Sequence, residues 1–244
     1  MTSSLSTFTS LSTLNPKDIP TEETELKAFI SKIVSEAQAK IDSTDTWKTG
    51  KVYQNGIVTT KSHQFSGEKF KWHLRESYHN ILDQNSSLEN DLDGIGWDMF
   101  YDNLFMNHTE NEVKYIESCE SAHKLQVIKQ GSAEIWRTCY KLAFPMTDRD
   151  FVFLILTQET TPDPTGPRSF LIISLPILHP FQTGHTRGKY ISIEEVKEEI
   201  LTSNDNNQLE RKRIKWKMII QSDAGGMVPI WISDLALPSK ISEE

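Results

Sequence analysis

The stretch that decides the fold runs from Ala133 to Ile155 and reads AEIWRTCYKLAFPMTDRDFVFLI. Apolar and polar residues alternate in its first part, and its second part is apolar on both faces. Pro145 and the pair Thr147-Asp148 separate the two parts. Period-two patterning interrupted by turn residues predicts a β-hairpin. Because the second strand is apolar on both faces, we expect a core or helix to cover one face and a cavity to border the other.

Composition restricts the classes of function that remain open. The chain has 244 residues, of which 37% are hydrophobic, and its net charge of -8 argues against a nucleic-acid binder. Its two cysteines, Cys119 and Cys139, are too few for a disulfide framework or a structural zinc site. No apolar run is long enough for a membrane span. Free thiols are typical of a reducing compartment, and we expect a monomeric cytoplasmic protein.

The first residues differ in composition from the rest. Residues 1–17 are rich in Ser and Thr, and no Lys or Arg precedes Lys17, which disfavours a secretory signal or transit peptide. This composition predicts a disordered tail over residues 1–20 and a single domain over residues 21–244.

Hydrophobic periodicity predicts a helix, several strands, a second helix, further strands and a terminal helix. The expected helices span residues 21–41, 97–107 and 227–241, and the expected strands fall within 47–80, 115–142, 151–156, 169–175, 190–200 and 211–222. We expect Leu125 and Val127 to be buried. This order indicates an α+β fold with helices against a long, curved antiparallel sheet. A curved sheet closed over by a long C-terminal helix would leave an apolar hollow suited to a small molecule.

Residues 176–188 form a loop long enough to be functional. They read PILHPFQTGHTRG and include Leu178 and Phe181, which look exposed. Loops of this length are often lids, and we interpret the two side chains as part of a gate. An ordinary bridge between strands is an equally good interpretation.

Two motifs resemble those of START lipid-transfer domains. The stretch FPMTDRDFV, residues 144–152, resembles the P-x-x-x-R-D-F-V signature of that family, and SDAGGMVP, residues 222–229, resembles the D-x-G-G-x-x-P entry to its lid helix. Residues 97–116 are similar to the fungal branch of START-like domains, and the resemblance covers roughly residues 24–241.

The resemblance implies a helix-grip fold around one lipid-sized cavity. It also implies binding or transfer of a lipid or sterol, with transient membrane contact, rather than catalysis. Many family members place a charged pair inside the cavity. The best-matching inward positions here are Trp136 and Ile155, which are uncharged, and this favours a mostly apolar ligand.

If the fold is of this kind, a set of apolar and aromatic residues lines the cavity, although the sequence alone describes a plain core equally well. The expected lining is Trp136, Thr138, Tyr140, Phe151, Phe153, Ile155, Leu171, Ile173, Trp216, Met218, Ile220, Met227, Ile230 and Trp231. Thr138 and Tyr140 are the candidate polar contacts, because a buried hydroxyl needs a partner. We interpret Arg149 and Asp150 as a structural pair or turn cap.

Motifs for catalysis, metals or cofactors are absent from the sequence. The seven histidines show no metal-ligand spacing, and there is no G-x-S-x-G or phosphate-binding glycine motif. We expect no metal and no cofactor, and we read Glu194 and Glu198 as solvated charges. Lys215 and Lys217 either dock on anionic lipid or keep a strand edge soluble. Two alternatives stay open: an enzyme of the cyclase or hydrolase type, which needs an inward acid or base, and an interaction domain with a collapsed pocket.

Overall fold

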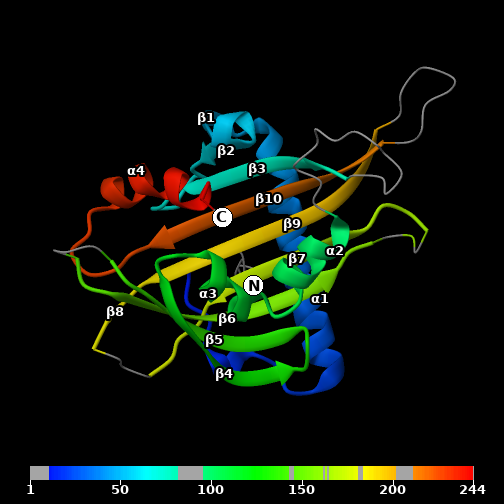
Figure 1. The fold of residues 1–244 in the computed structure, drawn as a ribbon. Helices are drawn as coiled ribbons and strands as arrows, with labels where there is room; N and C mark the ends of the chain where they lie inside the picture. Colours follow the sequence, from blue (N-terminus) through cyan, green and yellow to red (C-terminus); the bar gives the residue numbers. More distant parts are fainter. Residues whose placement is uncertain are drawn as a thin grey trace, which may run out of the picture.

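The computed structural model describes residues 11–81, 96–142, 146–161, 163, 165–180, 184–201 and 211–243. An antiparallel sheet dominates the fold, with the strand order β1-β2-β3-β10-β9-β7-β6-β5-β4 and a short β8 that pairs with β6 (Figure 1). The strands are β1 (Lys48–Tyr53), β2 (Val58–His63), β3 (Trp72–Asn80), β4 (Cys119–Lys129), β5 (Ala133–Tyr140), β6 (Arg149–Glu159), β7 (Ser169–Pro176), β8 (Thr186–Arg187), β9 (Lys189–Leu201) and β10 (Arg211–Asp223).

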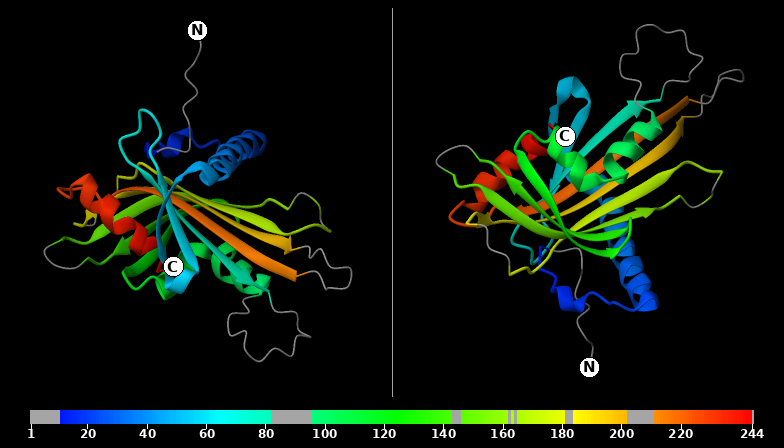
Figure 2. Two further views of the ribbon diagram at one scale, coloured as in Figure 1. Left: turned by 90° about the horizontal axis from the view of Figure 1, so that it is seen from above. Right: turned by 60° about the horizontal axis from the view of Figure 1, so that its bottom comes forward.

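Helices lie on both sides of this sheet. They are α1 (Glu23–Asp42), α2 (Trp97–Phe100) with a following π turn (Tyr101–Phe105), α3 (His108–Tyr115) and α4 (Ile230–Ile241). Figure 2 shows α1 on one side of the sheet and α2, α3 and α4 on the other. We call the side under α1 the outer face and the other side the inner face. The predicted α+β class with a large antiparallel sheet and a C-terminal helix is therefore confirmed, whereas α3 was not predicted.

The predicted β-hairpin is present. β5 and β6 pair antiparallel, with Trp136 opposite Phe153 and Thr138 opposite Phe151. β6 is buried from Arg149 to Leu156 except for the half-buried Phe151, which agrees with the prediction of a strand covered on both faces. Directly opposed side chains lie on the same face of a sheet. Both pairs therefore belong to the inner face.

α1 forms because its apolar residues recur at three-and-four spacing. Leu26, Ile30, Ile33, Ala37 and Ile41 are buried, and Glu22 caps the helix by accepting a hydrogen bond from the Glu25 backbone N–H across 3.0 Å. This stripe packs on the outer face of the sheet. The largest apolar cluster of the described residues thus lies under α1, away from the inner face.

The expected tail is wrong for residues 11–20. Leu14 forms a parallel bridge with Ile177, and its backbone N–H donates to the Pro176 carbonyl oxygen at 2.8 Å. Ile19 is buried, and Leu11 and Leu14 pack against the outer cluster. The few apolar residues hold this segment in place, although Ser and Thr dominate its composition. Residues 1–10 lie outside the described part.

Two expectations about strand residues are wrong, because the exposure of a residue depends on where its strand lies in the sheet. β4 lies at one end of the strand order, and Leu125 and Val127 are exposed there. β10 is a central strand between β3 and β9, so its lysines do not form a strand edge. Lys217 is buried and binds the Thr44 hydroxyl at 2.9 Å, and Lys215 pairs with Glu76 at 3.0 Å.

Candidate functional site: the inner face of the sheet

Aromatic side chains form a connected layer on the inner face. Tyr140 contacts Phe151 with ring centroids 5.5 Å apart, and Tyr190 contacts Phe151 at 5.3 Å and Phe153 at 5.1 Å. Strands β5, β6 and β9 provide these four rings. Other members of this inner cluster come from the strands and from the helices above them: Trp97, Phe100, Leu104, Trp136, Ile155, Phe170, Ile172, Val196, Ile214 and Trp216. The predicted residues Trp136, Phe151, Phe153, Ile155 and Trp216 therefore lie together on one face.

Leu171 and Ile173 were assigned to the wrong face of β7. Both are fully buried in the cluster under α1, whereas Phe170 and Ile172 face the inner side. All eight residues of β7 are buried. Apolar residues that continue through both parities of a strand give no sign of which face is which. The inward residues of β7 are therefore one position away from those that we expected.

α4 covers the other part of the inner face, against β3 and β10. Met218 and Ile220 pack there with Ile241 and the half-buried Leu237. Ile230 is also half-buried. The helix continues through Pro238 to Ile241.

The expectation that Met227 and Trp231 line the interior is wrong. Met227 is 98% exposed and Trp231 is 67% exposed, and Leu235, one turn further on, is 75% exposed. Trp231 and Leu235 are four residues apart on α4, so they form one solvent-facing stripe, whereas Met227 lies in the turn before the helix. Leu178 of the predicted gate loop is exposed as well. Phe181 lies outside the described residues.

Charged side chains reach the inner face, contrary to the prediction of an uncharged interior. His108 Nε2 lies 3.5 Å from a carboxylate oxygen of Glu112 and 3.5 Å from one of Glu194. Glu194 also accepts a hydrogen bond from Trp216 Nε1 at 3.3 Å. The guanidinium of Arg75 stacks on the Trp216 ring at 3.7 Å from its centroid. Arg75, His108 and Glu194 are buried. Together with Glu112, these charged groups form one interior network.

The electrostatics of this network follow from its geometry. Burial alone would lower the pKa of His108, but the carboxylates of Glu112 and Glu194 outweigh it and raise this pKa to about 9. Burial raises the pKa of Glu194, and the cations His108 and Arg75 oppose that rise. His108 is therefore protonated at neutral pH.

Sequence reasoning missed this network for identifiable reasons. Its charges lie on β3, β9 and α3, whereas the search for an inward pair considered β5 and β6. Glu194 and Glu198 looked solvated, yet both are buried, and Glu198 pairs with Arg168 at 2.6 Å. The i,i+4 spacing of His108 and Glu112 was the available signal, because it places both side chains on one face of a helix.

Arg149 and Asp150 hold the segment before α4. Arg149 Nε donates to the Ala224 carbonyl oxygen at 2.7 Å, and another of its nitrogens donates to the Thr147 carbonyl. Asp150 is 1% exposed and receives two hydrogen bonds from Arg187, at 2.8 and 3.0 Å. Both residues contact other parts of the protein at the end of the sheet where the chain enters α4.

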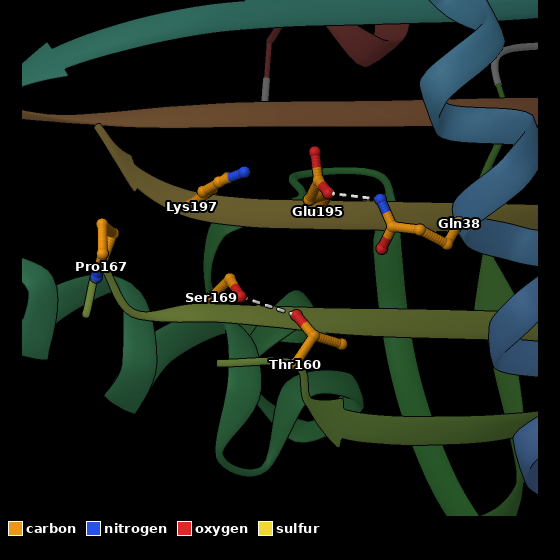
Figure 3. Close-up of a pocket in the computed structure, with 6 residues that line it drawn as sticks. All are labelled: Gln38, Thr160, Pro167, Ser169, Glu195 and Lys197. Carbon is orange, nitrogen blue, oxygen red and sulfur yellow. Dashed lines mark hydrogen bonds between the residues drawn. The ribbon is translucent and has the colours of Figure 1, made fainter. Parts of the chain in front are cut away.

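A separate hollow of about 280 Å³ opens beside α1. Figure 3 shows its lining, in which Gln38 donates to Glu195 at 2.8 Å and Thr160 and Ser169 share a hydrogen bond of 2.8 Å. Pro167 and Lys197 complete the lining. These polar groups already bind one another, and the hollow is on the side of the sheet away from the aromatic layer. This hollow is therefore separate from the candidate site on the inner face.

Within the described residues, no group of three or more His, Cys, Asp or Glu side chains is arranged to hold a metal ion. None of the helices described is both long and apolar enough to cross a membrane.

The architecture described above defines a START-like helix-grip domain. The chain is similar to human StAR-related lipid transfer protein 5, with a TM-score of 0.62 and 15% identity over 89% of this chain and 93% of that one. It is also similar to human STARD10, with a TM-score of 0.57 and 12% identity over 93% of this chain and 78% of that one. The lipid transfer and protein localization domain of human StarD13 matches with a TM-score of 0.54 and 12% identity, over 84% and 92%.

The sequence itself places the chain in a family. The chain belongs to DUF3074, described as a protein family of unknown function, whose model matches residues 72–244. A relative from Schizosaccharomyces pombe, the uncharacterized protein C577.11, is 21% identical over 208 residues, which cover 85% of this chain and 78% of that protein. The suspected START-like resemblance is thus confirmed at the level of the fold.

Proposed function

We propose that this protein binds a hydrophobic ligand, a lipid or sterol, between the inner face of the sheet and helices α2, α3 and α4, and carries it between membranes. The observation that supports this most is the inner aromatic layer of Tyr140, Phe151, Phe153 and Tyr190 within a lipid-transfer scaffold. Apolar walls shield a ligand from water with roughly 25 cal/mol per Å² of buried apolar area.

α4 is the element that we propose to open. It is held to β3 by contacts of Asp234 with His73 at 3.3 Å and with Lys71 at 3.4 Å. Its outward stripe of Trp231 and Leu235, with the exposed Met227 in the turn before it, presents apolar surface where a membrane would meet it. Trp favours the interface between lipid and water, since its ring combines apolar area with a polar N–H. Contact with a bilayer would therefore stabilise an outward-turned α4.

A catalytic role on the same scaffold is the second candidate, because His108, Glu112 and Glu194 point inward. A general acid–base group works best when its pKa lies near the working pH. The two carboxylates raise the pKa of His108 to about 9, which keeps it as a cation in an ion pair at neutral pH. This supports binding over proton transfer, and we propose a protein without enzymatic activity.

Extraction of labelled lipids from phosphatidylcholine vesicles tests the proposal. Phe153 is 1% exposed in the aromatic layer, so Phe153→Arg places an unpaired charge there and should abolish uptake by the protein that remains folded. Val127→Arg is the matched control, since Val127 is exposed on the edge strand β4, and it should take up lipid like the wild type. Equal uptake by a folded Phe153→Arg variant would refute the inner face as the binding site.

A further inference from the structure

Three buried polar atoms near the aromatic layer have no hydrogen-bond partner among the described residues. They are Oγ1 of Thr109, Oγ1 of Thr138 and Oε2 of Glu112. Thr138 is 0% and Thr109 is 1% exposed. Burying a hydroxyl or carboxylate oxygen without a partner costs free energy, and most buried polar atoms in proteins are paired. Three such atoms in one region therefore indicate that a ligand supplies the missing partners.

The three atoms belong to the walls around Tyr190 and Phe151. Thr138 lies directly opposite Phe151 across β5 and β6, and the Phe151 ring contacts Tyr190. Burial and then the nearby carboxylate of Glu112 raise the pKa of Tyr190. Thr109 is one turn before Glu112 on α3, which places both on one side of that helix. Glu112 of α3 thus lies near Tyr190 and Thr138 of β5 lies beside Phe151, while Thr109 lies on the same side of α3 as Glu112.

The charges of this network determine which polar group of a ligand can bind beside it. In this network the carboxyl groups of Glu112 and Glu194 face the cationic side chains of His108 and Arg75. Both cations are engaged, since His108 lies 3.5 Å from each carboxylate and Arg75 stacks on Trp216. An anionic ligand group would lie beside the carboxyl group of Glu112, and two like charges close together in a buried site are unfavourable. A neutral group avoids this repulsion.

We propose that Thr109, Glu112 and Thr138 form a subsite for the hydroxyl group of an uncharged lipid alcohol. The hydroxyl donates its proton to Glu112 Oε2 and accepts a hydrogen bond from one of the two threonine hydroxyls. A sulfate head group offers only acceptors to Glu112, and a phosphate monoester, with a second pKa of about 6, is mostly the dianion at neutral pH, so both are rejected. This inference rests on the proposed function, because it names the chemical class of the ligand that the inner face would hold.

Two matched lipid pairs test the inference and distinguish the sources of the hydroxyl. Phosphatidylcholine vesicles would carry cholesterol or cholesterol sulfate in one arm, and diacylglycerol or phosphatidic acid in the other. Each pair shares its hydrophobic body and differs in the polar group. We expect the neutral member of at least one pair to be bound about tenfold or more tightly than its anionic partner, which corresponds to 1.4 kcal/mol or more. The pair that shows this preference identifies a sterol or a glyceride.

The other outcomes separate the two proposals. Equal binding of neutral and anionic partners, or preferential uptake of phosphatidylcholine itself, would overturn the hydroxyl subsite and leave the proposed function in place. Uptake of no lipid at all would overturn the proposed function and this inference with it.

Variants assign the preference to the named atoms. Thr138→Val keeps the side-chain shape and removes the hydroxyl, so it should weaken binding of the neutral alcohol about fivefold or more. Glu112→Gln should reduce the discrimination against the anionic partner, because it removes the carboxylate charge. The controls are Thr49→Val on exposed β1 and Glu110→Gln, an exposed residue of α3, and both should keep wild-type preferences. Wild-type preferences in a folded Thr138→Val and a folded Glu112→Gln would refute the subsite.

Discussion

The Nε atom of Arg149 donates a hydrogen bond to the carbonyl oxygen of Ala224 across 2.7 Å, although 75 residues separate them in the chain. This contact joins the start of β6 to the turn that leads into α4. The P-x-x-x-R-D-F-V and D-x-G-G-x-x-P motifs, which suggested the fold from sequence, are therefore two halves of one structural unit. The unit fixes where the helix over the inner face begins.

Replacing Arg149 with Lys should loosen this unit. The lysine keeps the charge but cannot donate to the carbonyl groups of Ala224 and Thr147 in the geometry of the guanidinium fork. We expect the free energy of unfolding, measured by urea denaturation, to fall by about 1–3 kcal/mol. Arg213→Lys is the control, because Arg213 pairs with the partly exposed Glu199 at 2.6 Å and should cost less than about 1 kcal/mol. Equal losses in both variants would contradict the role given to Arg149.

Both the backbone conformation at residue 225 and the lack of room for a Cβ atom there require a glycine. Its φ is +68°, and an added Cβ would lie 2.3 Å from the carbonyl oxygen of Arg187, which cannot move independently of β8. Gly225→Ala should therefore destabilise the protein by more than the roughly 1 kcal/mol that positive φ alone costs a non-glycine residue. Gly131→Ala isolates the conformational part, since Gly131 has a φ of +71° and nothing within 4 Å of the added atom. Thermal unfolding of the two variants should rank Gly225→Ala clearly below Gly131→Ala, and the reverse order would be evidence against this packing.

His108 should make stability depend on alkaline pH. Glu112 and Glu194 overcome burial and raise the pKa of His108 from 6.5 to about 9, so the folded state holds a proton that the unfolded state releases. This contribution, on the order of 3 kcal/mol, is fully present below pH 6.5 and is lost as pH rises through about 9. Urea denaturation of wild type and His108→Gln across this range should show the loss in the wild type only. The exposed His123 on β4 provides the control His123→Gln, which should follow the wild type. A His108→Gln variant with the wild-type pH slope would contradict the ion-pair network.

The stripe on α4 should matter for transfer but not for folding. Trp231 and Leu235 are mostly exposed, so Trp231→Ser combined with Leu235→Ser should change the free energy of unfolding by no more than about 0.5 kcal/mol per site. The same double variant should slow movement of a fluorescent lipid from donor to acceptor vesicles. Val127→Ser, on exposed β4, removes apolar surface elsewhere and should leave the transfer rate unchanged. Unchanged transfer in the double variant would exclude the stripe as a membrane contact.

Local sequence patterns predicted the elements well where periodicity and turn chemistry agree. The β5–β6 hairpin, α1 and the entry to α4 follow from alternation, from three-and-four spacing and from the two motifs. The side of the sheet to which each strand residue points was harder to predict. β7 is apolar at each position from Phe170 to Ile173, so Leu171 and Ile173 could not be told from Phe170 and Ile172 without the position of α1.

The interior charges could not be predicted because burial depends on partners that are distant in sequence. Glu194 stands beside Glu195 in a strand that also carries Lys197, Glu198 and Glu199, and only the docking of His108 from α3 and Trp216 from β10 places it inside. Trp231 shows the converse, because a large aromatic residue in a helix suggests a core position. The packing of α4 through Leu237 and Ile241 turns Trp231 outward.

The most direct test of the central claim is native mass spectrometry of the purified full chain, followed by extraction and identification of any bound lipid. We predict a mass shift that corresponds to one lipid per protein, and a lipid whose polar group is an uncharged hydroxyl. A protein that purifies empty, and that also takes up neither sterols nor glycerolipids from vesicles, would contradict the account of the inner face as a lipid-binding site.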